Sequence, residues 1–391
     1  MKILTKFLLL ISVVTLSATE ITPATNDISA FPIPKDKLSI KGSFNYLDKD
    51  IDLFNSISKS ANKDYGYIGK LSGGDLSFRY GIHRHISIFY NFQALNIDYF
   101  NQDLTNIKNE LFARVNFYDV PNYIFDVFSI DVGVIRNASS NLNINDASSF
   151  VKLTKKIRPN LENLNDLNGN LLYKGKTISN QIDQKTGQSL SPKLAISDLS
   201  DNSFFIRFLW GNRFTNSLFN FYTGLKYSDV STKIAYSPKS SQNPSYKELS
   251  SAFGKDDDLG RSEKDIFAGI NFIFETQNYI FDLNYEYDRL FGRGNITLGD
   301  HNHNNIFDIN IAAKINRDLL VYVGGKAMTN QFNSVIPYMY NDYTQDSFGD
   351  RYGYVKLGFI YNFDLISIDF NDFLEMDKTQ KDASSLSSYL F

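Results

Sequence analysis

The feature that most constrains this 391-residue chain is an alternation of apolar and polar side chains, which recurs from Leu38 to Phe363. In residues 75–82, for example, Leu76, Phe78, Tyr80 and Ile82 alternate with polar or small residues. Because successive side chains of a β-strand point to opposite faces, a period of two predicts a strand with one apolar and one polar face. The chain is therefore expected to be built from such strands.

We expect about twelve strands of this kind. They are predicted near residues 38–47, 75–82, 86–97, 110–118, 123–135, 204–213, 219–227, 265–275, 281–288, 307–314, 319–328 and 352–363.

The connections between these strands alternate between short and long. Tight turns are predicted at 83–84, 119–122, 215–217, 276–278 and 316–318, and the longest break covers 136–202. This sorting is typical of bacterial outer-membrane barrels, in which periplasmic turns are short and extracellular loops are long. The sequence therefore predicts an all-β fold: a transmembrane antiparallel up-and-down β-barrel over 38–363, with 136–202 as a long extracellular loop.

The two ends of the chain lie outside this pattern. Lys2 and Lys6 precede an apolar stretch from Phe7 to Leu16, which is too short to span a bilayer, and small residues follow it. We expect a signal peptide at 1–18, a periplasmic N-terminal segment at 19–37 and a periplasmic C-terminal tail at 364–391.

The composition agrees with a membrane barrel and argues against other classes. Aromatic residues make up 15% of the chain, yet its mean hydropathy is only -0.27. This combination fits strands with one face in water and aromatic girdles at the membrane interfaces. A net charge of -3 argues against nucleic-acid binding. The sequence has no cysteine, so it offers no disulfide framework or thiol chemistry.

One short motif carries a family resemblance. The segment Leu357–Phe363 resembles the C-terminal strand signal of bacterial outer-membrane barrel proteins: Gly358, Tyr361 and Phe363 match, whereas Leu357 stands where a polar residue is usual. In that family the signal usually ends the chain, but here 364–391 follow it. The resemblance identifies no subfamily. It implies a Gram-negative outer membrane, contact with its lipid and lipopolysaccharide, and insertion by the barrel assembly machinery.

If the apolar face meets lipid, the polar face lines the interior of the barrel. The charged residues then predicted to line the lumen are Lys41, Arg79, Arg114, Arg207, Arg213, Lys226, Asp265, Asp282, Glu286, Asp288, Asp308, Lys314, Lys326 and Lys356. Acidic residues gather on the strands between 265 and 314, which would give the lumen a transverse field that sorts solutes by charge. Cross-strand ion pairs that close the interior are the alternative.

These patterns favour a porin-like channel for passive passage of small polar solutes. The alternatives are a non-conducting barrel that acts as a surface adhesin or structural anchor and, less favoured, an outer-membrane lipid hydrolase. No enzyme activity, catalytic residue, cofactor or metal is predicted. His301 and His303 supply only two metal ligands, and Asp256–Asp258 lack the downstream Glu of a calcium loop. No Ser is seen that would pair with His303.

Overall fold

The computed structural model describes residues 27–48, 68–99, 102–119, 124–144, 172–173, 176–177, 193–237, 257–258, 260–292, 303–328 and 352–364. These ranges contain strands and turns, and no helix among them is long and apolar enough to cross a membrane. The predicted signal peptide and nearly all of the predicted C-terminal tail lie outside the described residues.

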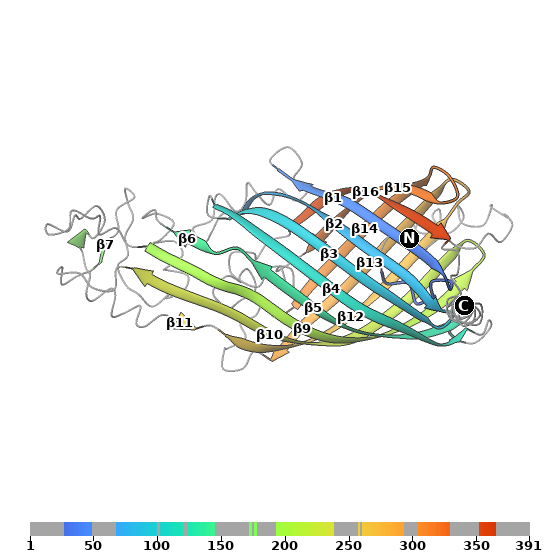
Figure 1. Ribbon diagram of the computed structural model, residues 1–391, viewed down its shortest axis with the longest axis horizontal. Coiled ribbons are helices and arrows are strands. Elements are labelled where there is room, and N and C mark those ends of the chain that lie inside the picture. The colour runs from blue at the N-terminus through green and yellow to red at the C-terminus, as the bar shows by residue number, and fades with distance from the viewer. Residues whose placement is uncertain are drawn as a thin grey trace, which may run out of the picture.

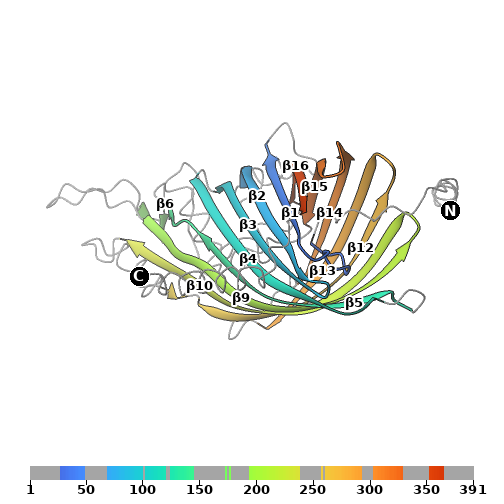
Figure 2. The same ribbon diagram turned by 45° about the vertical axis from the view of Figure 1, so that its right-hand side comes forward.

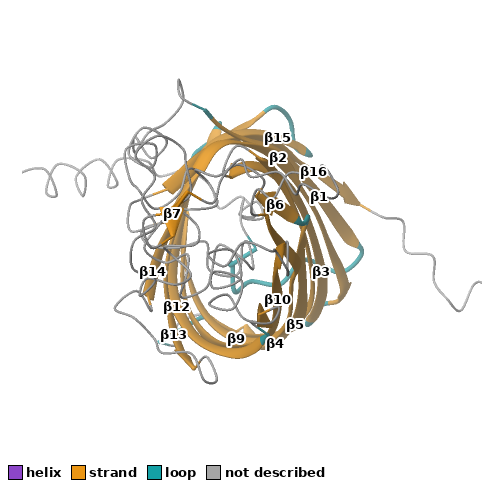
Figure 3. Cartoon of the chain, turned by 90° about the vertical axis from the view of Figure 1, so that its left-hand side faces the viewer, coloured by secondary structure: helices purple, strands orange, loops and turns teal. Residues whose placement is uncertain are grey.

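Twelve antiparallel strands form a single closed ring (Figures 1 and 3). They are β1 (Lys37–Leu47), β2 (Ile68–His83), β3 (Ile86–Tyr99), β4 (Gln102–Asp119), β5 (Val127–Ser139), β9 (Lys193–Phe214), β10 (Ser217–Ser237), β12 (Arg261–Glu275), β13 (Tyr279–Gly292), β14 (His303–Lys314), β15 (Leu319–Met328) and β16 (Tyr352–Asp364). Four shorter strands are β6 (Leu142–Ile144), β7 (Leu172–Tyr173), β8 (Lys176–Thr177) and β11 (Asp257–Asp258). Of these, β6 and β11 pair with the far ends of β9 and β10.

The ring closes between the first and last strands. Leu38 of β1 pairs with Phe363 of β16, and the ladder continues as far as Tyr46 and Val355. Each barrel strand pairs with the barrel strands on either side of it along the chain, so the topology is up-and-down. The predicted fold class and strand count are confirmed. The predicted last strand, 352–363, differs from β16 by one residue.

The outer face of the ring is apolar. Its exposed side chains include Phe44, Phe78, Leu111, Val134, Phe204, Leu225, Ile270, Leu283, Ile309, Val323 and Leu357. Charged side chains such as Arg114 and Asp131 are instead buried inside the ring. A soluble protein would place these two classes the other way round. An apolar outer face on a closed antiparallel ring is the arrangement that lipid requires, and the protein is a membrane-spanning β-barrel.

Several strands continue well beyond the ranges that the sequence predicts: β2 starts at Ile68, β4 starts at Gln102 and β10 ends at Ser237. β5 runs to Ser139 and β9 starts at Lys193, so residues 136–139 and 193–202, predicted as loop, are strand. In this part of β9 the inward Leu199 and Ile196 are buried and apolar, whereas the outward Asn202 is polar. Beyond the lipid the outer face of a strand no longer needs to be apolar. In this part of β9 the apolar side chains therefore point inward and the polar ones outward, the reverse of the pattern used to recognise the other strands, so the sequence pattern did not reveal it.

An arginine on the outer face should destabilise the barrel according to its depth. We expect Ile270→Arg, in the middle of the apolar face of β12, to cost about 2–4 kcal/mol. Ile315→Arg is the matched control, because Ile315 lies at the short-turn rim, where such a change costs about 0–1 kcal/mol. Urea unfolding from phospholipid vesicles, followed by the fluorescence of Trp210, the chain's one tryptophan, measures both. Equal costs would contradict the assignment of the lipid-facing surface.

The orientation of the barrel can be tested because the chain has no cysteine of its own. The lengths of the connections predict that Asn141, beyond β5, faces the cell exterior and that Gln277, between β12 and β13, faces the periplasm. Both residues are exposed. A membrane-impermeant maleimide should therefore label Asn141→Cys but not Gln277→Cys in intact cells, and should label both after lysis. The opposite pattern would show that the barrel is inverted.

Candidate functional site: the interior of the barrel

A buried carboxylate joins three neighbouring strands in the interior. Asp131 of β5 lies opposite Arg114 of β4 on one side and Arg207 of β9 on the other. The Arg114 guanidinium donates two hydrogen bonds to the carboxylate, at 2.7 and 2.9 Å, and Arg207 donates at 2.5 and 2.9 Å. The guanidiniums also stack on aromatic rings, with Arg114 4.8 Å from the Phe89 centroid and Arg207 5.3 Å from that of Phe112. Geometry and packing together compensate for the burial of these charges.

A second ion pair also joins residues that lie directly opposite each other on adjacent strands. Lys226 of β10 lies opposite Asp265 of β12, and its ammonium is 2.9 Å from the carboxylate. Both residues are buried.

Two further ion pairs reach across an intervening strand. The Lys356 ammonium on β16 donates to both carboxylate oxygens of Asp308 on β14, at 2.6 Å. Between them, β15 presents Gly324, which lies opposite Lys356 on one side and Asn310 on the other. A glycine leaves space on the inner wall for the lysine side chain to pass. In the same way, Lys314 of β14 pairs with Glu275 of β12 across β13.

The acidic residues of β13 have contacts of a different kind. Asp282 accepts a hydrogen bond from the Asn271 amide at 2.7 Å, and Glu286 accepts one from the Tyr222 hydroxyl at 3.1 Å. Asp288 is buried further along the same face. The sequence predicted that these three carboxylates share a face, and the structure places them so.

Two lysines predicted to line the lumen form no ion pair among the described residues. Lys326 is half-buried on β15 and lies opposite Asp308 in the register, but the Asp308 carboxylate binds Lys356 instead. Lys41 of β1 is also half-buried, with its ammonium 5.8 Å from the centroid of the Tyr322 ring.

The interior also contains a stretch of chain that precedes the first strand. Residues 27–36, here called the N-terminal segment, lie inside the ring at the end with the short turns (Figure 2). Ala30 is fully buried: its N–H donates to the Asn220 side chain at 2.9 Å, and its carbonyl accepts from Asn116 at 2.9 Å and Ser129 at 2.6 Å. The sequence predicted 19–37 as a periplasmic N-terminal segment; the structure places residues 27–36 of that range against the inner wall of the ring.

Arginines hold the beginning of the N-terminal segment. The Asp27 carboxylate is 2.5 Å from Nε of Arg79 on β2. Arg114, besides its bonds to Asp131, donates to the backbone carbonyl of Asp27 at 2.8 Å and to that of Ser29. The interior therefore satisfies both the side-chain charge and the main-chain acceptors at this end.

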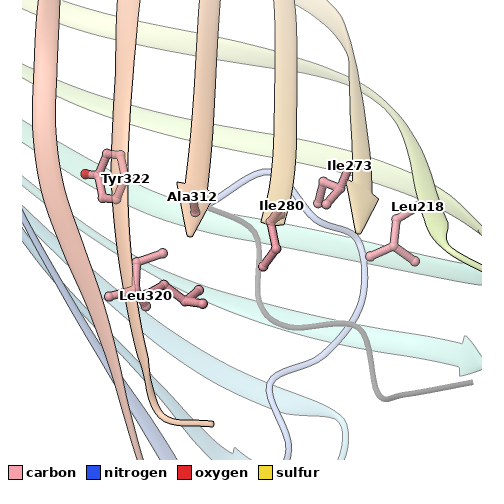
Figure 4. Packing of buried hydrophobic residues seen from close by; sticks show 7 residues of the cluster. Leu218, Ile273, Ile280, Ala312, Leu320 and Tyr322 are labelled. Carbon is pink, nitrogen blue, oxygen red and sulfur yellow. The ribbon is translucent and has the colours of Figure 1, made fainter. Parts of the chain in front are cut away.

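Apolar contacts hold the rest of the N-terminal segment. The Arg213 guanidinium lies 4.6 Å from the centroid of the Phe31 ring. Phe31 packs against a cluster of buried side chains near the short turns, and Figure 4 labels all of them except Ile360. The cluster consists of Leu218, Ile273, Ile280, Ala312, Leu320, Tyr322 and Ile360. Ile33 packs with Phe89, Phe112, Ile135 and Phe205.

Sequence reasoning missed the N-terminal segment because it has no alternation. The signal that could have found it is the run from Ala30 to Pro34, which is apolar although no strand follows until Lys37. Pro32 and Pro34 lack a backbone N–H, so this run has fewer donors to satisfy when buried. Asp36, with φ of 63°, then turns the chain into β1.

The other sites considered from the sequence are mostly outside the described residues. His301 is among them, and His303 begins β14 with its ring 6.2 Å from that of Tyr287. No group of three or more His, Cys, Asp or Glu within the described ranges could hold a metal ion.

No protein-family model and no curated protein matches this chain. Solved structures do match over most of its length. The translocator domain of the autotransporter NalP from Neisseria meningitidis is 7% identical, with a TM-score of 0.45, and the match covers 85% of this chain and 90% of that one. The Pseudomonas putida toluene transporter TodX is 12% identical with a TM-score of 0.36, and the match covers 83% of this chain and 88% of TodX. The KdgM porin is 8% identical with a TM-score of 0.33, and the match covers 84% of this chain and 99% of the porin. These matches assign the chain to no family.

Removing the carboxylate between the two arginines should strongly destabilise the barrel. In Asp131→Asn, two buried guanidiniums lose their shared counter-ion, so we expect a loss of about 3–5 kcal/mol in the free energy of unfolding. Asp318→Asn, in the exposed turn between β14 and β15, should change it by less than about 0.5 kcal/mol. Urea titration in vesicles compares the two. A small effect at Asp131 would mean that water screens this cluster.

Proposed function

We propose that the protein is an outer-membrane channel for the passive passage of small polar solutes. The observation that carries the proposal is the presence of half-buried inward charges that form no ion pair among the described residues. Lys41 and Lys326 form none, and the hydrogen-bond donor to Glu286 is a neutral tyrosine hydroxyl.

Charges of this kind need solvation. An unpaired charge in a dry protein interior costs several kcal/mol, and three such charges in one closed lumen would not be compatible with a stable, dry barrel. Water along the inner wall removes this cost. The lumen of a twelve-strand barrel is also wider than that of an eight-strand barrel, which side chains just fill. A hydrated pathway beside these three side chains is therefore the simplest account of their charges.

A non-conducting barrel that serves as a surface adhesin or anchor is the second candidate. The ion pairs of Asp131, Asp265 and Asp308 favour it, because they join neighbouring parts of the wall and occupy the interior. The N-terminal segment favours it too, since Ala30 and Ile33 are buried inside the ring. Single-channel recording in a planar bilayer separates the two candidates.

If the lumen conducts, its selectivity should respond to the unpaired charges in opposite directions. Glu286→Gln removes a negative charge and should lower the permeability ratio of K⁺ to Cl⁻. Lys326→Gln removes a positive charge from the same inner wall and should raise that ratio. Reversal potentials in a salt gradient measure both variants.

Asp229→Asn is the matched control, because Asp229 is exposed on the outward side of β10 and its charge lies outside the lumen. This variant should leave the reversal potential unchanged. A conducting protein with unchanged selectivity in Glu286→Gln and Lys326→Gln would place both charges outside the permeation path. A protein that never conducts would favour the anchor.

A further inference from the structure

We propose that the inner wall at the short-turn end is a binding site for an extended peptide, and that the N-terminal segment is its displaceable ligand. While bound, the segment closes this end of the lumen. The effect on passage rests on the proposed channel function, whereas the peptide site itself rests on the contacts alone.

The wall binds the main chain of the segment through side chains. Asn220, Asn116 and Ser129 bond to the backbone N–H and carbonyl of Ala30 at 2.6–2.9 Å, and Ser87 accepts from the N–H of Ile33 at 3.3 Å. The backbone groups of these wall strands already pair with one another in the barrel ladder. Residues 27–35 are therefore not a further strand, and they can leave without breaking the ladder. Asp36 differs, because its N–H donates to the backbone carbonyl of Gly81 in the wall at 2.8 Å.

The shape of the wall also fits the segment. On the inner face of β9, a Cβ at Gly211 would lie 3.0 Å from the Ala30 Cβ and 3.0 Å from the Phe31 ring. On β2, a Cβ at Gly81 would lie 2.6 Å from the Ile33 carbonyl oxygen. Two strands from different parts of the ring thus have glycine where the segment approaches most closely, as expected of a surface shaped to accept a peptide.

Three side-chain contacts define the class of ligand. Arg79 binds an acidic residue, Asp27. Four positions later, an aromatic residue, Phe31, contacts Arg213 and the apolar cluster near the short turns. Two positions after that, an aliphatic residue, Ile33, packs in a cluster with Phe89 and Phe112. The ligand is thus an extended peptide with an acidic, an aromatic and an aliphatic residue in the order Asp27, Phe31, Ile33.

The site keeps its own structure when the segment leaves. Arg114, which binds the segment's carbonyls, retains Asp131 as its partner. Asp36, in a left-handed backbone turn, stays attached to the ring because its N–H donates to the Gly81 carbonyl of β2 at 2.8 Å. The chain that leaves is therefore the part before Asp36, and occupied and vacant states differ at residues 27–35 and not in the ring of strands.

A reversible cross-link tests whether the segment closes the lumen. In the full chain, Ala30→Cys with Gly211→Cys introduces the only two cysteines, and a shift of less than about 1 Å brings their Cβ atoms to disulfide distance. We expect the disulfide to form, the oxidised protein to lose conductance and reduction to restore it. The two single variants should conduct alike with and without reductant.

Peptide binding in trans tests the site independently of conductance. The full-length double variant Phe31→Ser, Ile33→Ser weakens the resident ligand and leaves the wall unchanged. A fluorescent synthetic peptide with the sequence of residues 27–36 should bind this variant, as measured by anisotropy, and a scrambled peptide should not. Adding Ser129→Ala, which removes one hydrogen bond to the ligand's backbone, should weaken binding about two- to tenfold.

The outcomes separate the two proposals. Absence of both the disulfide and peptide binding overturns the peptide site. If the peptide binds and no form of the protein conducts, the site stands and the channel function fails. If the oxidised and reduced proteins conduct equally, the segment does not close the lumen, and that part of the inference is wrong.

Discussion

The structure depends on the closure of one hydrogen-bonded ladder. In hydrocarbon there is no water to satisfy an exposed backbone N–H or carbonyl, so a sheet can stand in a membrane only if its edges pair with each other. The pairing of β1 with β16 meets this requirement. It also assigns one side of every strand to lipid and the other to the lumen. All the charged chemistry of the membrane-spanning part must therefore lie inside the ring.

Placing charges inside a ring changes which of them can meet. On a flat sheet, ion pairs form mainly between adjacent strands, as Lys226 and Asp265 do here. On the concave side of a barrel, side chains converge, so Lys356 reaches Asp308 across the glycine of an intervening strand. The same convergence lets side chains from β4, β5 and β10 surround Ala30 together. Curvature, as well as register, thus builds the interior.

The fold could be predicted from the sequence because lipid requires every second side chain of a membrane-spanning strand to be apolar. The alternation at Leu76, Phe78 and similar residues predicted the strands, and the short turns between them predicted that successive strands are neighbours in the barrel. The contacts inside could not be predicted, because they depend on register between strands far apart in sequence. Asp131 shows this: its pairing with Arg207 joins residues 76 positions apart. The N-terminal segment was missed because it follows no alternation and is held by side chains of the wall.

The hydrogen bond between Ala30 and Asn220 joins residues 190 positions apart. Contacts of such long separation form late, because the wall that supplies them must first exist. The segment comes first in the sequence, yet it can take its place only once β4, β5 and β10 have joined the ring, with β9 between β5 and β10. During insertion the barrel therefore passes through a stage in which its lumen is unoccupied at the short-turn end. Biogenesis itself thus exposes, for a time, the surface that the mature protein covers.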